Sequence, residues 1–125
     1  MKQSEKLLGE HNIQATDVRI KVLEAFKKSK NLLTSQDINN KYSNSIDRIT
    51  LFRTLQLFLE KKILNRVADT TGTVYYDLNE DGKTYFYFKC LDSNKVTRLQ
   101  EVQTPNLPKK YKGEEFNFLI QGQCK

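Results

Sequence analysis

Residues 47–61 read Asp-Arg-Ile-Thr-Leu-Phe-Arg-Thr-Leu-Gln-Leu-Phe-Leu-Glu-Lys, and this stretch decides the fold. When its residues are placed at about 100° per step, it predicts an amphipathic helix with one apolar face. That core face consists of Leu51, Leu55 and Phe58, with Leu59 beside them. The helix is therefore expected to pack along one side and to leave the other side exposed.

The exposed side of this helix has a distinct chemistry. It carries Ile49, Arg53 and Gln56, and Phe52 is expected between the two faces. An isoleucine and an arginine one turn apart can contact a thymine methyl group and hydrogen-bond to guanine. An ordinary surface helix would show the same pattern, so this feature alone leaves both interpretations open.

Three shorter helices are predicted before residue 47, each from a start signal and a helical apolar period. They run from Ser4 to Glu10, from the N-cap Thr16 to about Ser29, and from the capping box Thr34–Asp37 towards Tyr42. His11, the single histidine, follows the first of these helices and is expected to be a solvated side chain. The first third of the chain is therefore expected to be helical.

After the fourth helix, the helical spacing of apolar residues gives way to runs with strand character. Residues 63–68 and 73–78 are rich in β-formers and flank the turn 69–72, which predicts a hairpin. Several helices followed by a two-stranded hairpin form the outline of a winged helix, whose last helix enters the major groove. Residues 79–83 then predict a polar linker.

A second unit is predicted after this linker. Residues 85–90, 95–99 and 115–120 have strand character, and Pro105 and Pro108 interrupt the segment between the last two. Three strands in so short a segment cannot bury much apolar surface alone. We therefore expect this unit to pair with a second copy of the chain.

Composition narrows the class of protein. Of the 125 residues, 38% are hydrophobic and 29% charged, which is typical of a soluble globular protein. No apolar run approaches the roughly 18 to 20 residues of a membrane span, and the first residues do not resemble a signal peptide. We therefore expect a cytoplasmic protein without a membrane partner.

Charge is distributed unevenly between the two halves. Residues 1–66 contain 13 Lys and Arg against 7 Asp and Glu, a net charge of +6, whereas residues 67–125 contain 8 of each. Such an excess is expected where a surface faces the phosphates of a nucleic acid, although a solvated basic surface has the same composition.

Three motifs occur in the order typical of one family of bacterial repressors. Residues 15–19 (Ala-Thr-Asp-Val-Arg), 33–38 (Leu-Thr-Ser-Gln-Asp-Ile) and 50–55 (Thr-Leu-Phe-Arg-Thr-Leu) stand where that family has T-x-x-R, L-T-x-x-D-I and T-V-Y-R-T-L. From about Leu7 to Lys125 the chain resembles the ferric uptake regulator (Fur) family. Phe52 replaces the usual tyrosine, which implies an altered sequence preference rather than lost binding.

The resemblance implies an α+β protein and a mode of action. Residues 1–79 would form a winged-helix DNA-binding domain, and residues 80–125 a small, strand-rich α/β dimerisation domain. The homodimer would bind double-stranded DNA and repress transcription by covering a promoter. The implied DNA-binding residues are Thr16, Arg19, Ile49, Thr50, Phe52, Arg53 and Gln56.

The resemblance also implies that metal sensing is lost. Tyr85, Tyr87 and Cys90 stand where the family has H-x-H-x-x-C, so both histidines are replaced. The two C-x-x-C pairs of the family's structural zinc site retain only Cys90 and Cys124. We therefore expect no cofactor. Three alternatives remain for the cysteines, namely two inert thiols, which we favour, a reversible disulfide, and part of a zinc site.

Other functions have less support in the sequence. No paired carboxylates, no nucleophile with a base and no phosphate-binding glycine loop stand out, so we expect no enzymatic activity. A small-molecule pocket lined by Tyr85 and Tyr87 is a disfavoured alternative to an aromatic dimer core. The rival function is a dimeric interaction protein that keeps the fold without sequence-specific DNA recognition.

Overall fold

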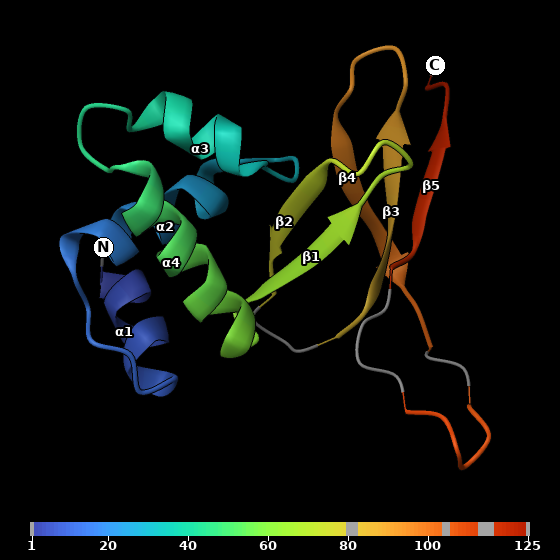
Figure 1. Ribbon diagram of the computed structural model, residues 1–125, viewed down its shortest axis with the longest axis horizontal. Helices are drawn as coiled ribbons and strands as arrows, with labels where there is room; N and C mark the ends of the chain where they lie inside the picture. The colour runs from blue at the N-terminus through green and yellow to red at the C-terminus, as the bar shows by residue number, and fades with distance from the viewer. Residues whose placement is uncertain (1, 80–82, 104–105, 113–116, 125) are drawn as a thin grey trace.

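The computed structural model describes residues 2–79, 83–103, 106–112 and 117–124. Four helices precede five strands, namely α1 (Lys2–Glu10), α2 (Asp17–Lys28), α3 (Ser35–Lys41), α4 (Arg48–Glu60), β1 (Leu64–Ala68), β2 (Val74–Leu78), β3 (Tyr85–Cys90), β4 (Val96–Glu101) and β5 (Leu119–Gly122). The helices group on one side, the sheet of β3–β5 lies on the other, and the hairpin β1–β2 lies between them (Figure 1). The predicted α+β class is confirmed.

The helices α2, α3 and α4 begin where their capping residues predict. The Thr16 hydroxyl accepts a hydrogen bond from the Arg19 amide at 3.3 Å. Thr34 and Asp37 form the predicted capping box, each accepting from the other's backbone N–H, at 3.1 and 2.9 Å. These side chains satisfy N–H groups that have no partner within the helix.

The start of the first helix differs from the prediction. Helix α1 begins at Lys2 rather than at Ser4, and the Ser4 side chain is fully buried. His11 also differs, because it is half-buried rather than solvated, and its Nδ1 donates to the Leu7 carbonyl at 3.0 Å. That bond satisfies one of the carbonyls at the end of α1.

One apolar core joins the four helices to the start of β1. Its fully buried members include Leu8, Val22, Leu23, Leu55, Phe58 and Ile63. Three of the four predicted core positions of α4 are buried, while Leu59 is half-buried and packs against the core. Removing these side chains from water is the main favourable term for this half of the fold. Within the described ranges, no helix has the length and apolar character needed to cross a bilayer.

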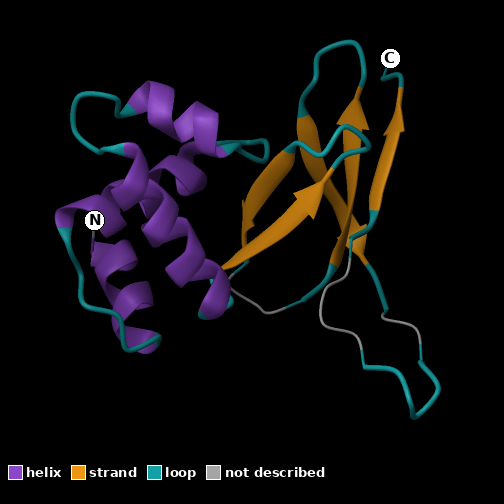
Figure 2. Cartoon of the chain, viewed as in Figure 1, coloured by secondary structure: helices purple, strands orange, loops and turns teal. Residues whose placement is uncertain are grey.

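The predicted hairpin is confirmed. Strands β1 and β2 pair antiparallel from Leu64↔Leu78 to Ala68↔Val74, each starting one residue later than predicted. Gly72 lies in the connecting turn with a φ of 88°, a conformation that glycine adopts without strain. A further bridge between Leu33 and Tyr76 attaches the segment between α2 and α3 to β2. The hairpin is thereby fixed to the helical layer (Figure 2).

The second sheet has the strand order β4-β3-β5. Strands β3 and β4 are antiparallel, while β3 and β5 are parallel and pair from Tyr87↔Leu119 to Cys90↔Gly122. The predicted third strand, 115–120, is found later, at Leu119–Gly122; residues 115–116, like Pro105 and residues 80–82 of the predicted linker, lie outside the described residues.

Candidate nucleic-acid interface

The outward face of α4 exposes two large apolar side chains beside cations. Ile49 is 66% exposed and Phe52 58% exposed, and Arg53 and Gln56 are exposed as predicted. Phe52 points about 100° away from the core residue Leu51, as expected for a position between the two faces, and its side chain is exposed. Three residues after Ile49 the helix has turned by about 300°, so Phe52 points only about 60° away from Ile49. The α4 face therefore combines aliphatic, aromatic and cationic groups.

The position of this face is fixed at the start of α4. The Asp47 carboxylate accepts a hydrogen bond from the Thr50 backbone N–H at 2.7 Å, and this bond lowers the pKa of Asp47. Thr54 is buried, and its hydroxyl donates to the Thr50 carbonyl at 2.8 Å. The first turn of α4 is thus held by side chains on both sides of the helix, which orients the residues that follow.

The motifs around residues 16–19 and 50–53 meet in space. Thr16, Arg19, Thr50 and Arg53 line one hollow of about 260 Å³ between the start of α2 and the first half of α4. Arg19 is oriented by a 2.8 Å hydrogen bond from Nη1 to the Gln14 carbonyl. Two guanidinium groups and two hydroxyls that converge in this way suit a phosphate oxygen.

A second hollow of about 420 Å³ lies between α3 and α4. It is lined by Ile49, Phe52 and Arg53, together with Arg48 and with Ser35, Gln36 and Asn39 of α3. The sequence did not single out Arg48 or Gln36. A signal for Arg48 existed, because a cation in the first turn of a helix is electrostatically unfavourable and needs another reason to be there. Gln56 lines neither of the two hollows.

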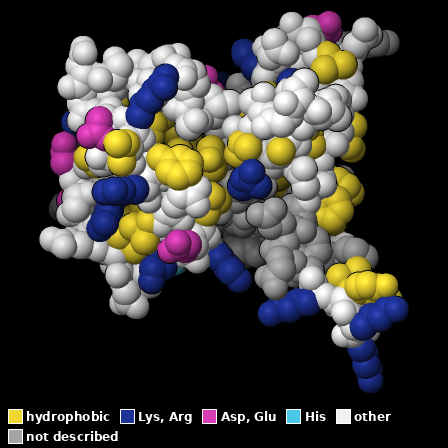
Figure 3. All heavy atoms as spheres, in the orientation of Figure 1, with side chains coloured by type: hydrophobic (Ala, Val, Ile, Leu, Met, Phe, Trp, Pro, Cys, Tyr) yellow, Lys and Arg dark blue, Asp and Glu magenta, His cyan; other side chains and the backbone are white. Residues whose placement is uncertain are grey.

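The arginines of α4 are not committed to partners within the chain. Neither Arg48 nor Arg53 forms an ion pair with any residue that the structure describes. Over the helical half, apolar and basic side chains lie next to each other on the surface (Figure 3). Cations without counter-charges and exposed apolar groups together are what a DNA groove requires of a protein.

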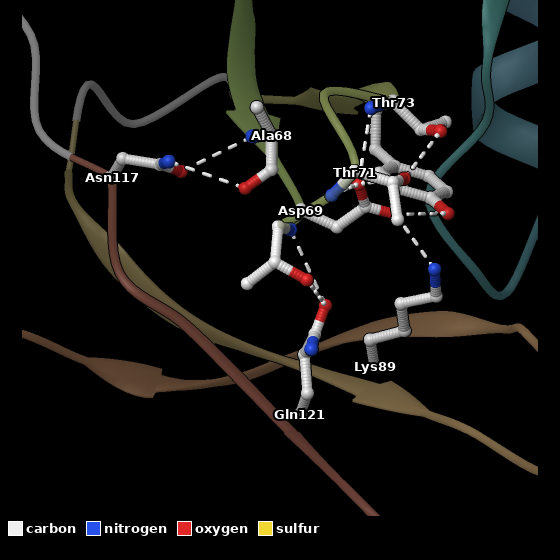
Figure 4. A network of polar contacts seen from close by, with 9 residues as sticks. Ala68, Asp69, Thr71, Thr73, Lys89, Asn117 and Gln121 are labelled. Atoms are coloured by element: carbon white, nitrogen blue, oxygen red, sulfur yellow. Dashed lines mark hydrogen bonds and ion pairs between the residues drawn. The ribbon is translucent and has the colours of Figure 1, made fainter.

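The tip of the hairpin, by contrast, is attached to the second sheet (Figure 4). Lys89 Nζ of β3 lies 2.6 Å from Asp69 Oδ2, and the side chains are only 12% and 0% exposed. The Asp69 carboxylate also accepts from Thr71 and from the Thr73 amide. The hydrogen bond from Lys89, followed by that from Thr71, places the pKa of Asp69 well below its ordinary value.

Further contacts extend this attachment along the hairpin. Asn117 exchanges two hydrogen bonds of 3.2 Å with the backbone of Ala68, and Gln121 accepts from Thr70. Beneath these polar contacts a shared apolar cluster forms, consisting of Leu32, Val67, Tyr75, Tyr87 and Val96. The hairpin and the second sheet therefore form one packed unit in this structure.

The two tyrosines that were singled out in β3 belong to this contact. The Tyr87 hydroxyl donates to Asp77 at 2.8 Å, and burial raises the pKa of Tyr87 above its ordinary value. Arg98 pairs with Asp77 at 2.8 Å and lies over the Tyr85 ring, 4.3 Å from its centroid. Both rings pack between the hairpin and the sheet, and neither ring lines the hollows that the described residues form beside α2, α3 and α4.

The expectation of two inert thiols is wrong. Cys90 and Cys124 form a disulfide, with their Cα atoms 5.6 Å apart. The parallel pairing of β3 and β5 brings them together, because Gly122 lies opposite Cys90 and the chain continues two residues further to Cys124. That pairing joins segments about thirty residues apart, so the local sequence pattern does not contain it.

These residues do not fit a transition-metal site. Zinc requires thiolates, imidazoles or carboxylates, but both sulfurs are bonded to each other and the Tyr87 hydroxyl retains its proton and donates to Asp77. Among the described residues, no three His, Cys, Asp or Glu side chains lie close enough together to coordinate one ion.

Comparisons with known proteins agree with this architecture. The Ferric uptake regulator family matches residues 10–121. The Vibrio cholerae ferric uptake regulator superposes with a TM-score of 0.71 at 16% identity, covering 96% of this chain and 98% of that one. A zinc uptake regulator complexed with zinc and DNA gives 0.71 at 16% identity, with 98% and 89% covered.

A third structure is the iron-bound ferric uptake regulator of Francisella tularensis, with a TM-score of 0.65, 23% identity and coverage of 90% and 92%. A comparison with curated protein sequences gives no match. The solved structures share the fold, and the family match spans both the helical half and the second sheet. The chain therefore belongs to the ferric uptake regulator family, whose members are transcriptional regulators and not enzymes.

Proposed function

We propose that the chain is a cytoplasmic, homodimeric repressor that inserts α4 into the major groove of its operator and needs no metal to do so. Residues 1–79 act as the DNA-binding domain and residues 80–125 as the dimerisation domain. Base contacts come from Ile49, Phe52, Arg53 and Gln56, and phosphate contacts from Thr16, Arg19 and Thr50. Occlusion of a promoter by the dimer represses transcription.

The observation that carries this proposal is the exposed α4 face. Ile49 and Phe52 are more than half exposed beside Arg53, which has no ion-pair partner among the described residues. Exposing two large apolar groups has no benefit for a monomer in water, whereas thymine methyl groups give them a partner. Arg53 also lines the hollow that contains Thr16 and Arg19, so one side chain connects the base-reading and phosphate-binding parts.

The second sheet supports the homodimer. Alternate residues of its strands face the hairpin, as Tyr87 and Lys89 do, while the residues between them form an outer face. This outer face carries the apolar residues Phe86, Phe88, Leu99, Phe118 and Ile120, together with Thr97 opposite Phe88. Leu99 is 48% and Ile120 49% exposed, so the described residues of one chain leave this part of the face uncovered. A second copy would supply that cover and place two α4 helices about one DNA turn apart.

The contacts of the second sheet support independence from metal. Where metal ligands would be needed, Cys90 is bonded to Cys124 and Tyr87 is bonded to Asp77. The hairpin is attached to the sheet by the Asp69–Lys89 and Asp77–Arg98 pairs, so no ion is required to join them. The rival function, a dimeric interaction protein without specific DNA recognition, would leave the unpaired arginines of α4 without a role.

The test is DNA binding by the full chain, with operators first selected from a random duplex pool. Fluorescence anisotropy then compares Arg53→Ala with the parent on selected and random duplexes at two salt concentrations. Loss of a bidentate base contact should weaken selected binding by roughly 5- to 150-fold, equivalent to about 1 to 3 kcal/mol. Binding to random DNA should change by only a few-fold.

A matched control removes one positive charge elsewhere. Lys95 is exposed and lies before β4, so Lys95→Ala should leave selected binding unchanged. If the pool yields no duplex that binds better than random DNA, the rival interaction function replaces this proposal. If Arg53→Ala binds as the parent does, α4 is not the element that reads the bases.

A further inference from the structure

A separate hollow lies where the helices, the hairpin and the second sheet meet. Its volume is about 730 Å³, within the 300 to 1,000 Å³ typical of small-molecule sites. Phe26 and Lys27 of α2, Lys30 of the following segment, Tyr76 and Asp77 of β2, and Arg98 of β4 line it. It shares no lining residue with the two hollows beside α4.

The charges around this hollow do not balance. Asp77 is the one acidic group among its described lining residues, and Arg98 neutralises it through contacts of 2.8 and 2.9 Å. Lys27 and Lys30 add two further cations; neither forms an ion pair with a residue that the structure describes, while the Glu24 carboxylate interacts with Lys27 electrostatically. Two ammonium groups are therefore available at the rim to an anion.

The inner wall of the hollow is partly apolar, and polar atoms make up the larger share of its surface. Phe26 and Tyr76 are each 6% exposed and Leu32 is 7% exposed, so little of each reaches solvent. The wall is also rigid, because Tyr76 pairs with Leu33 through backbone bonds of 3.1 and 2.7 Å, and Leu32 donates to the Val96 carbonyl at 2.8 Å. The hollow thus combines a preformed wall that is apolar in part with cations at its rim, and both features occur in small-molecule sites.

We propose that this hollow binds a small organic anion, a carboxylate or phosphate carried on an apolar body. The anionic group pairs with Lys27 and Lys30, while the body packs on Phe26 and Tyr76. Arg98 completes the site from the second sheet, oriented by Asp77. Because the lysines belong to the helical half and Arg98 to the second sheet, the bound anion contacts both parts of the chain. This site is independent of DNA recognition by α4.

The test measures binding of three probes to the full chain by ligand-observed NMR titration. Benzoate and phenyl phosphate present a carboxylate and a phosphate on the same ring, and benzamide is the neutral counterpart of benzoate. We expect saturable binding of benzoate or phenyl phosphate, at least ten-fold tighter than benzamide, and the stronger of the two identifies the anionic group. Inorganic phosphate should bind at least ten-fold more weakly than phenyl phosphate, because it lacks the apolar body.

Two variants complete the test. The double variant Lys27→Gln/Lys30→Gln should bind the tighter of the two aromatic anions at least ten-fold more weakly than the parent. The control variant Lys109→Gln/Lys110→Gln, which removes two exposed lysines elsewhere, should bind it with unchanged affinity. Arg53→Ala should bind the probe normally, which separates this result from any failure of DNA binding. The proposal is overturned if neither aromatic anion binds, if benzamide or inorganic phosphate binds as tightly, or if the Lys27/Lys30 variant, checked for a normal thermal transition, retains full affinity.

Discussion

Charged side chains are arranged in opposite ways on α4 and at the contact between the hairpin and the second sheet. On α4, Arg48 and Arg53 are exposed and have no ion-pair partner among the described residues. At the hairpin contact, Lys89 lies 2.6 Å from Asp69, and both side chains are largely or fully removed from solvent. The difference teaches that net charge alone does not locate a binding surface. Paired charges fix the fold, and unpaired charges remain available to a partner.

The largest effect is expected from the disulfide, which closes the second sheet. Cys124→Ser removes a cross-link between residues that are 34 apart in the sequence. In the chain-entropy account this lowers the free energy of unfolding by about 3 to 4 kcal/mol, because the unfolded chain gains freedom. Urea denaturation of the oxidised protein and of the variant measures the difference.

Reductant provides the control for this prediction. The parent with dithiothreitol should unfold at the same urea concentration as Cys124→Ser, and the variant should not respond to the reductant. Equal midpoints for the oxidised parent and the variant would show that the cross-link does not stabilise the second sheet. The second sheet would then differ from α4 only in its non-covalent contacts.

The next effect concerns the buried ion pair. Lys89→Met keeps most of the apolar stem but leaves the fully buried Asp69 carboxylate without its counter-charge. We expect Tm to fall by roughly 10 °C, measured by calorimetry. Lys95→Met, at an exposed position before β4, should leave Tm within about 2 °C. Similar Tm values for the two variants would mean that paired and unpaired lysines contribute equally to thermal stability.

The pH dependence identifies Asp69 as the affected partner. Its pKa is lowered in the folded protein, chiefly by Lys89, so its contribution to stability is fully present above the ordinary carboxyl pKa of about 3.9 and declines progressively as pH falls from there towards the lowered pKa of the folded protein. In Lys89→Met the pKa of Asp69 rises. The Tm difference between parent and variant should therefore shrink between about pH 5 and pH 3. A constant difference would assign the effect of the substitution to packing.

The sequence predicts well those parts of the fold that depend on residues close to each other along the chain. Thr16, Thr34 and Asp47 cap helices where their positions indicate, because an N-cap needs only a backbone N–H two or three residues ahead. The parallel pairing of β3 with β5 depends on residues about thirty positions apart, and no local period encodes it. The hairpin contacts were missed, and the disulfide was ranked below two free thiols, for the same reason.

The candidate DNA site was predicted for two different reasons. The outward direction of Ile49 and Arg53 follows from helical geometry, whereas Thr16 and Arg19 were indicated by resemblance alone, and the structure places them beside Arg53. Helical geometry also places Phe52 between the core face and the outward face, and its side chain is 58% exposed. Arg48 was missed because a search for core and polar stripes gives no attention to a cation next to an N-cap.

The smallest predicted effect on stability is that of Arg48→Ala. This substitution tests directly whether an unpaired cation on α4 is unfavourable in the free protein. Arg48 is the first residue of α4, directly after the Asp47 cap, and no acidic residue lies in that first turn. The partial positive charge of the helix N-terminus repels a cation there, so Arg48→Ala should raise the free energy of unfolding by about 0.5 kcal/mol. Arg53, one turn further along, lies beyond this effect, and Arg53→Ala should change stability by less than about 0.5 kcal/mol in either direction.

The same substitution should weaken DNA binding if Arg48 faces a phosphate. Anisotropy titrations at several salt concentrations should show that the slope of log affinity against log salt falls by about 0.9, the value for one lost phosphate contact, with little change in sequence preference. Higher stability together with weaker binding would mean that this cation is unfavourable in the free protein and becomes favourable only when a phosphate neutralises it. Lower stability would show instead that Arg48 has a structural role within the chain, and the distinction between paired and unpaired charges would then fail on α4 itself.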